Sequence, residues 1–216
     1  YWSSINGRTE ALSIGNTASA KALRTIQQKD LPSIDPTKRV LGVIRPTSEV
    51  LGQYSKTKHV GIMGTTGTIQ SDSYPIELSK FYPSLKVFQQ ACPMWVPLIE
   101  NGEHDKPGAD YFIKLYLDQL FTQSKDIDTI LLACTHYPLI ADKIKALLPA
   151  GVDLVTQGTI VAKSLANYLE NHPDLAQKCS QNGQLSFYTT DNPKDFEKKA
   201  STFFGQKIEA KHTDLA

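Results

Sequence analysis

Short apolar runs alternate with longer amphipathic stretches along most of the chain. The runs at 39–44, 59–63, 85–89, 127–133, 152–155, 185–188 and 207–209 predict strands. The amphipathic stretches predict helices at 17–28, 48–54, 68–80, 109–123, 141–148, 160–169 and 193–204. The run at 127–133 is continuously apolar, as expected for a strand that helices cover on both faces. This alternation predicts an α/β protein with mostly parallel sheets.

Prolines mark where the predicted elements begin and end. Pro32 and Pro36 are expected to end the first helix, and Pro93 and Pro97 to bracket an irregular stretch. Pro107 is expected to start the helix at 109–123, because proline is tolerated in a first helical turn.

Composition narrows the class of protein. With 216 residues, 40% hydrophobic and 21% charged, the chain suits one large globular domain or two small ones. A net charge of +1 predicts neither a nucleic-acid partner nor an anionic membrane surface. No apolar run is long enough to span a bilayer, and no signal peptide is recognisable, so the expected compartment is the cytoplasm.

Three widely spaced cysteines, Cys92, Cys134 and Cys179, argue against a disulfide framework and for reduced thiols. Cys92 and Cys179 are interpreted as ordinary thiols without a role in the chemistry. The chain starts at Tyr1 rather than at methionine, so it has been processed or an upstream segment is absent.

Cys134, Thr135 and His136 follow directly after the apolar run at 127–133. Open α/β sheets bind ligands at the carboxyl ends of their strands. A lone cysteine there is usually a small buried hydrophobe. A helix N-terminus and a nearby histidine, however, lower the pKa of a thiol, and a thiolate can take a proton or attack an electrophile. The block therefore favours a reactive thiol. No metal site is predicted, because zinc needs further ligands besides Cys134 and His136.

A glycine- and threonine-rich turn at 64–68 joins a predicted strand to a helix. It lacks the lysine and the spacing of a phosphate-binding P-loop. It is either a simple junction or a carboxylate cradle made of backbone N–H groups and the hydroxyls of Thr65 and Thr68.

Three further residues are candidates for polar contacts. Asn16 and Thr17 are suited to cap a helix, and a cap can also donate to a ligand carboxylate. Glu100 ends an apolar run and is either a surface residue or a partner that orients His136.

Two predicted strand ends have similar sequence patterns. Gly15-Asn16-Thr17 and the block at Cys134 each end an apolar run and open a helix. This similarity suggests two related halves that face each other. Position 15, however, holds glycine where a cysteine equivalent to Cys134 would be expected.

The chain resembles glutamate racemases, which belong to the cofactor-independent aspartate/glutamate racemase superfamily. The resemblance runs from about residue 14 to about 205, and residues 1–13 do not fit it. The segments that carry it are Asn16-Thr17-Ala18-Ser19-Ala20, Gly42-Val43-Ile44, Gly61-Ile62-Met63-Gly64-Thr65-Thr66-Gly67-Thr68, Pro97-Leu98-Ile99-Glu100 and Leu132-Ala133-Cys134-Thr135-His136-Tyr137-Pro138-Leu139.

The resemblance implies two pseudo-symmetric α/β domains with the active site in the cleft between them. Residues 1–44 and 157–216 would form a discontinuous first domain, whose N-terminal part would be missing, and residues 45–156 the second. No cofactor is expected, and the family is often dimeric, so a homodimer is the candidate assembly.

The resemblance also implies roles for single residues. Two cysteines would face the substrate α-carbon from opposite sides, one removing the α-proton and the other delivering a proton. Gly15 stands where the family has one of them, and the family's upstream Asp-Ser and Tyr-Gly pairs are not found. The resemblance further implies that Cys134 is the base toward L-glutamate, that His136 assists Cys134 and that Glu100 supports His136. The residues expected to bind the substrate are Asn16, Thr17, Thr65, Thr68 and Thr135.

The implied function is interconversion of L- and D-glutamate, which supplies D-glutamate for peptidoglycan. Glutamate is the expected small-molecule substrate. Two alternatives stay open: a non-catalytic or half-active glutamate-binding homologue, which Gly15 suggests, and a racemase for aspartate or another acidic amino acid.

Overall fold

A computed structural model describes residues 10–13, 15–36, 38–177, 179, 183 and 185–214. Residues 1–9, which do not fit the family resemblance, lie outside this part of the chain. The chain divides into a larger compact unit of residues 10–168 and a smaller one containing 169–216. The predicted domain boundaries, 44/45 and 156/157, both fall inside the larger unit, and the two-domain division stays a prediction.

The larger unit is built on a four-stranded sheet with the order β4-β3-β5-β6. All neighbouring strands in it run parallel, and a separate pair, β1 and β2, is also parallel. The α/β class with parallel sheets is therefore confirmed. The strands of this unit are β1 (Glu10–Ser13), β2 (Arg39–Gly42), β3 (His59–Gly64), β4 (Lys86–Ala91), β5 (Thr129–Ala133) and β6 (Asp153–Thr156).

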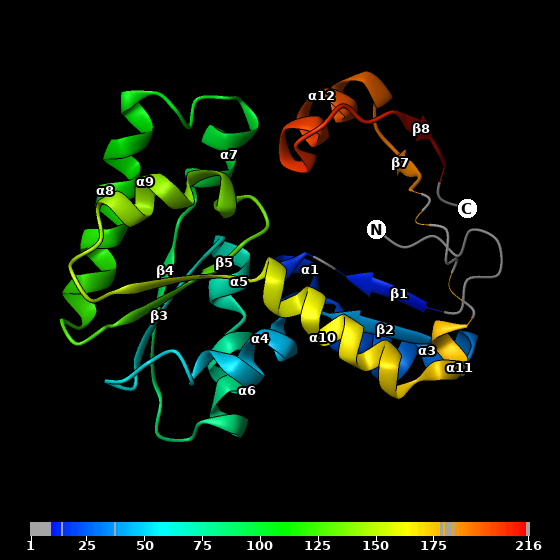
Figure 1. The fold of residues 1–216 in the computed structure, drawn as a ribbon, viewed down its shortest axis with the longest axis horizontal. Helices are drawn as coiled ribbons and strands as arrows, with labels where there is room; N and C mark the ends of the chain where they lie inside the picture. Colours follow the sequence, from blue (N-terminus) through cyan, green and yellow to red (C-terminus); the bar gives the residue numbers. More distant parts are fainter. Residues whose placement is uncertain are drawn as a thin grey trace. The chain divides into compact units, whose positions relative to one another are not determined.

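Helices join these strands and cover the sheet on two faces (Figure 1). A π-helical segment, η1 (Ile26–Asp30), and a 3₁₀ turn, η2 (Tyr137–Ile140), interrupt the series. The α-helices are α1 (Asn16–Lys21), α2 (Leu23–Thr25), α3 (Leu31–Ile34), α4 (Ile44–Leu51), α5 (Thr66–Gln70), α6 (Ser73–Phe81), α7 (Trp95–Glu100), α8 (Pro107–Gln123), α9 (Ala141–Ala146) and α10 (Gly158–Asn171).

Strand β5 is buried along its whole length, because both of its faces meet helices. Ile130 and Leu132 belong to the core cluster shared with α7, α8 and α9. Leu131 and Ala133 belong to the opposite cluster, shared with α4 and α6. This alternation follows from the two-residue period of a strand, and it places Cys134 on the same face of the sheet as Ile130 and Leu132.

The order of the sheet reverses beside β3. The chain passes from β3 outward to β4, then returns to β5 on the other side of β3 and continues to β6. Gly64 pairs with Ala133 in register, so the segments that follow β3 and β5 start side by side. Ligands of open α/β sheets bind at such a reversal, outside the carboxyl ends of the strands.

Several element predictions are wrong, and prolines account for most of them. The stretch around Pro97 is not irregular but forms α7, in which Pro97 occupies the first turn, where no N–H donor is needed. Helical structure also continues through Pro32, at the start of α3. The helix predicted at 68–80 is two helices, separated at Asp72, which has a left-handed φ of 51°.

The smaller unit contains α11 (Pro173–Ala176), β7 (Phe187–Thr189), α12 (Pro193–Phe204) and β8 (Ala210–His212), and β7 and β8 pair in parallel. The last strand lies three residues later than predicted. Asn192 caps α12 by accepting from the Lys194 N–H (2.9 Å). Across the two units, no described helix is long and apolar enough to cross a membrane.

Asp128 ties the segment before β3 to the start of β5. Its carboxylate accepts from the Ser55 hydroxyl (2.6 Å) and from the backbone N–H groups of Lys56 (2.7 Å) and Thr57 (2.8 Å). Burial opposes its ionisation, but these bonds and one from Thr129 lower its pKa to about 2. The start of the two central strands is thus fixed by one ionised side chain.

Asp128→Asn is expected to lower the free energy of unfolding by about 1–3 kcal/mol at pH 7, because two backbone donors lose a charged acceptor. The pKa of Asp128 is lower in the folded chain than in the unfolded one, so its contribution is complete above about pH 4 and is lost as the pH falls toward 2. Urea unfolding at pH 7 and pH 3 measures the loss of unfolding free energy and its dependence on pH. Asp118→Asn, at an exposed pair with Lys114, is the control; an equal loss in both variants would contradict the prediction.

Candidate active site

Cys134 lies directly after β5, at the reversal of strand order. Its side chain is largely buried, and 8% of the residue surface is exposed. Its Sγ lies 3.8 Å from Nδ1 of His136, and Nε2 of His136 lies 3.0 Å from Oε1 of Glu100. A thiol, an imidazole and a carboxylate are therefore connected in a line, a geometry in which the carboxylate holds the ring and the ring faces the thiol.

The pKa of Cys134 is raised above its usual value, not lowered as the sequence pattern predicts. Burial is the largest cause, and the negative charge of Glu100 adds to it. The backbone N–H groups of His136 and Tyr137 act in the opposite direction but do not offset burial. The resting thiol is therefore protonated at neutral pH, and a thiolate requires transfer of its proton to a base such as His136.

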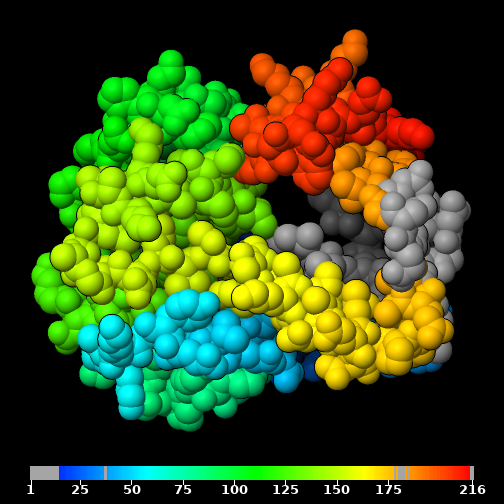
Figure 2. Space-filling model, in the orientation of Figure 1, coloured from blue at the N-terminus to red at the C-terminus, as the bar shows by residue number. Residues whose placement is uncertain are grey.

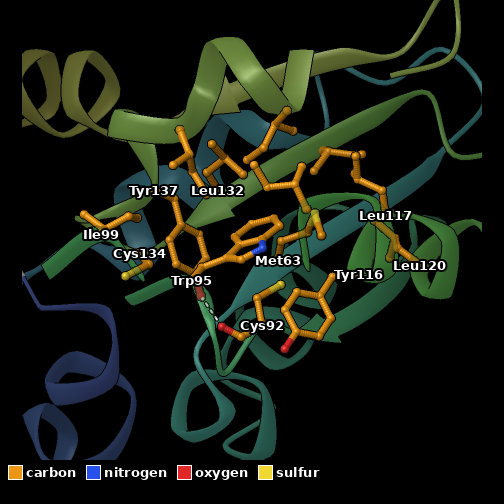
Figure 3. Close-up of a cluster of buried hydrophobic side chains, with 14 of the residues drawn as sticks. Met63, Cys92, Trp95, Ile99, Tyr116, Leu117, Leu120, Leu132, Cys134 and Tyr137 are labelled. Atoms are coloured by element: carbon orange, nitrogen blue, oxygen red, sulfur yellow. Dashed lines mark hydrogen bonds between the residues drawn. The ribbon is translucent and has the colours of Figure 1, made fainter. Parts of the chain in front are cut away.

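Cys134 lies at the edge of the apolar cluster between the sheet and α7, α8 and α9 (Figure 3). The ring of Trp95 packs edge-on against Tyr137, with 4.8 Å between centroids. The Tyr137 hydroxyl donates to the carbonyl of Cys92 (3.3 Å), which fixes the turn after Cys134 to the segment after β4. Cys92 itself is fully buried, in agreement with its interpretation as an ordinary thiol.

Three threonine hydroxyls form a second cluster, at the end of β3. Thr17 Oγ1 lies 2.8 Å from that of Thr65 and 3.2 Å from that of Thr68, and Thr65 and Thr68 are 3.1 Å apart. Thr65 also caps α5 by accepting from the N–H of Thr68 (3.4 Å). Helix α1 thus brings its Thr17 against the predicted cradle, and the sequence-predicted hydroxyls lie together.

Gly67 lets α1 approach this turn closely. A Cβ atom at position 67 would lie 2.9 Å from Cγ2 of Thr17, closer than real side chains pack. The same position is 3.3 Å from Cε and 3.5 Å from Nζ of Lys21. Lys21 therefore places a positive charge beside Gly67, in the turn between Thr65 and Thr68, a feature that the sequence does not reveal.

Asn16 lies in a buried polar network. Its Oδ1 accepts from the Tyr74 hydroxyl (2.5 Å), and its Nδ2 donates to Oε1 of Gln157 (2.6 Å). Gln157 Nε2 donates to the hydroxyls of Tyr74 (2.6 Å) and Thr47 (2.9 Å). The sequence predicts Asn16 as a polar site residue but none of these partners.

Comparisons with known proteins agree on one family. The chain is 32% identical to the glutamate racemase of Hydrogenobaculum sp., over 98% of this chain and 75% of that protein. The chain belongs to the glutamate racemase family. The fold matches a Bacillus anthracis glutamate racemase isoform with a TM-score of 0.83 at 30% identity, over 96% of this chain and 74% of that one. No family model matches the chain.

Solved glutamate racemases include one bound to an amino acid. The enzyme of Francisella tularensis, in complex with D-glutamate, matches with a TM-score of 0.78 at 26% identity, over 96% of this chain and 73% of that one. The family resemblance drawn from the residues is therefore confirmed. The roles predicted for single residues of this glutamate racemase family member stay predictions.

Gly15 occupies the N-cap position of α1, in extended backbone with φ −76° and ψ 122°. A Cβ atom there would meet Ala18 Cβ at 3.4 Å, an ordinary contact. The backbone therefore accommodates a side chain at position 15. Thr135 is exposed, and its hydroxyl lies 3.5 Å from Nδ1 of His136.

Proposed function

We propose that this chain catalyses proton transfer at the α-carbon of glutamate, with Cys134 as the base for the L-enantiomer. The observation that carries the proposal is the line from Cys134 through His136 to Glu100, at the reversal point of the sheet. Membership of the glutamate racemase family supports the substrate and the reaction class.

The first step generates the base. His136 Nδ1 takes the proton from Sγ of Cys134, and the resulting imidazolium is stabilised by Glu100 at Nε2. The thiolate then removes the α-proton of L-glutamate and becomes a thiol again. The electron pair left on the α-carbon is delocalised into the substrate carboxylate. Burial of Cys134 favours this step, because a thiolate of raised pKa is the stronger base.

The threonine cluster and Lys21 suit the rest of the substrate. Glutamate carries two carboxylates and one ammonium, and hydroxyl groups both donate and accept hydrogen bonds. We assign Thr17, Thr65 and Thr68 to substrate binding, with Thr135 beside His136. The ammonium of Lys21 supplies charge for a carboxylate at the same turn.

Gly15 determines how far the reaction proceeds. Racemisation by two bases needs a second acid–base group opposite Cys134, and glycine has no side chain to supply one. Cys134 can therefore reprotonate only the face from which it took the proton, and a solvent hydrogen enters the α-carbon when the thiol exchanges its own hydrogen with water before this return step. We propose exchange of the α-proton of L-glutamate with solvent and very little formation of D-glutamate, so that a supply of D-glutamate for peptidoglycan requires a cysteine at position 15.

The test is incubation of the protein with each enantiomer in D₂O. We expect slow loss of the α-proton NMR signal from L-glutamate, almost none from D-glutamate, and almost no inversion by chiral chromatography. Faster loss of the α-proton signal from L-aspartate than from L-glutamate in the same assay would identify an enzyme for another acidic amino acid. Binding of glutamate without exchange of either enantiomer would contradict the proposal and support a binding module. Equal and rapid exchange of both enantiomers would contradict the half-reaction.

A further inference from the structure

Asn16, Gln157 and Tyr74 form a closed ring of hydrogen bonds. Tyr74 donates to Asn16 (2.5 Å), Asn16 donates to Gln157 (2.6 Å), and Gln157 donates back to Tyr74 (2.6 Å). Each side chain thus donates once and accepts once around the ring. Bonds arranged in this way polarise one another, so the ring fixes the orientation of both amides.

The ring is buried and is anchored at one side. Tyr74 is fully buried, and the residue surfaces of Asn16 and Gln157 are 4% and 8% exposed. Gln157 also donates to the Thr47 hydroxyl (2.9 Å), which donates to the carbonyl of Val43 (2.8 Å). The atoms of α4 and of the first turns of α10 meet on the visible face of the larger unit, which agrees with this burial (Figure 2).

The members of the ring come from segments far apart in the chain. Asn16 opens α1, Tyr74 lies in α6, and Gln157 immediately precedes α10. Thr17 follows Asn16 directly and is the residue that contacts Thr65 and Thr68. The position of α1 relative to the hydroxyl cluster therefore depends on how Asn16 is held.

The ring is also within electrostatic reach of the candidate base. The pKa of Tyr74 is raised beyond its usual range, first by burial and also by the negative charge that Cys134 carries as a thiolate, although the bond from Gln157 opposes this. Tyr74 therefore keeps its proton and stays a donor to Asn16 at all pH values at which the protein is assayed.

We propose that Tyr74 and Gln157 are positioning residues for glutamate: they hold Asn16, and with it Thr17 at the start of α1, against the turn at 65–68. The proposal rests on the proposed function, because it assigns substrate binding to that turn. Neither side chain is expected to touch the reacting atoms. Their loss should therefore weaken substrate binding more than the chemical step.

Tyr74→Phe removes one hydroxyl and preserves the ring that fills the core. We expect the KM for L-glutamate in the exchange assay to rise about tenfold, which corresponds to one lost hydrogen bond in the network, and kcat to change less than threefold. Isothermal calorimetry is expected to give the same tenfold rise in Kd. Tyr82→Phe is the matched control. Tyr82 is the C-cap of α6, the helix that contains Tyr74, and its hydroxyl donates to the carbonyl of Glu49 (2.7 Å).

Gln157→Glu gives a readout that a purely structural role would not move. A protonated glutamic acid can accept from Asn16 and donate to Tyr74, whereas its carboxylate can only accept. We therefore expect the KM of this variant to approach the wild-type value at low pH and to rise as the pH increases. Gln157→Leu, which cannot bond at any pH, should show a raised KM throughout.

The outcomes separate the two proposals. A KM and Kd in Tyr74→Phe within twofold of the control would overturn the positioning role, even if the melting temperature falls. If the wild type binds glutamate without exchange, the proposed reaction fails, and the calorimetric Kd values of the same variants still decide the positioning role. Absence of any glutamate binding by the wild type overturns both.

Discussion

Cys134→Ser is expected to slow deuterium incorporation into L-glutamate by about 10²–10⁴-fold, the usual contribution of a positioned acid–base group. The substitution nearly keeps the size of the side chain but replaces a thiol by a hydroxyl, which is a far weaker acid, so much less of the anionic base forms by proton transfer to His136. The rest of the line, from His136 to Glu100, stays in place. The rate of loss of the α-proton NMR signal in D₂O measures the effect.

The matched control is Cys179→Ser, which makes the same atomic exchange at an exposed cysteine of the smaller unit. It is expected to leave the exchange rate unchanged. Glutamate binding measured by calorimetry should survive in Cys134→Ser, because the threonine cluster is intact. An exchange rate in Cys134→Ser equal to that of the wild type would exclude this thiol as the base. An equal decrease of the exchange rate in both variants would point to a general effect of removing cysteines.

The features near Cys134 were predictable because their signals are local. A continuous apolar run identified β5, and the residues directly after it identified the end of the strand at which ligands bind. The carboxylate cradle, one of the two interpretations that the sequence leaves open for the turn at 64–68, likewise agrees with the contact between the hydroxyls of Thr65 and Thr68. In each case the chemistry and the geometry are set within about eight residues of chain.

The pKa of Cys134 was predicted in the wrong direction, because local sequence does not reveal burial. Adjacent N–H groups and a histidine were visible in the sequence, and the structure keeps their effect. The apolar cluster beside Cys134 is assembled from α7, α8 and α9, which no local pattern connects to position 134. Desolvation by that cluster exceeds the local contribution.

The ring of Asn16, Tyr74 and Gln157 illustrates the same limit for polar groups. Tyr74 and Gln157 are separated by 83 residues, and Asn16 by 58 residues from Tyr74. A tyrosine and a glutamine in amphipathic segments are typical of half-exposed positions. Only the packing of α1, α6 and the start of α10 brings them together, so the sequence predicts Asn16 as a polar site residue but not what holds it.

Gly15→Cys is expected to convert exchange without inversion into racemisation. The family resemblance places a catalytic cysteine at this position, next to Asn16 and Thr17 at the start of α1. Extended backbone and a nearest contact of 3.4 Å give the new side chain room. We expect the rate of D-glutamate formation to rise by at least about 10²-fold, since a second positioned acid now protonates the opposite face of the α-carbon. Chiral chromatography measures it.

Gly15→Ser is the control that isolates the acid–base function of the thiol. Serine fits the same space and is a better helix cap than glycine, so it is expected to preserve stability without producing D-glutamate. The double variant Gly15→Cys with Cys134→Ser makes the opposite half-reaction, and deuterium should then enter D-glutamate rather than L-glutamate. If Gly15→Cys forms no more D-glutamate than Gly15→Ser, position 15 does not face the α-carbon. In that case exchange from L-glutamate reflects a site with one base only, and the pseudo-symmetric pairing of the two strand ends is wrong.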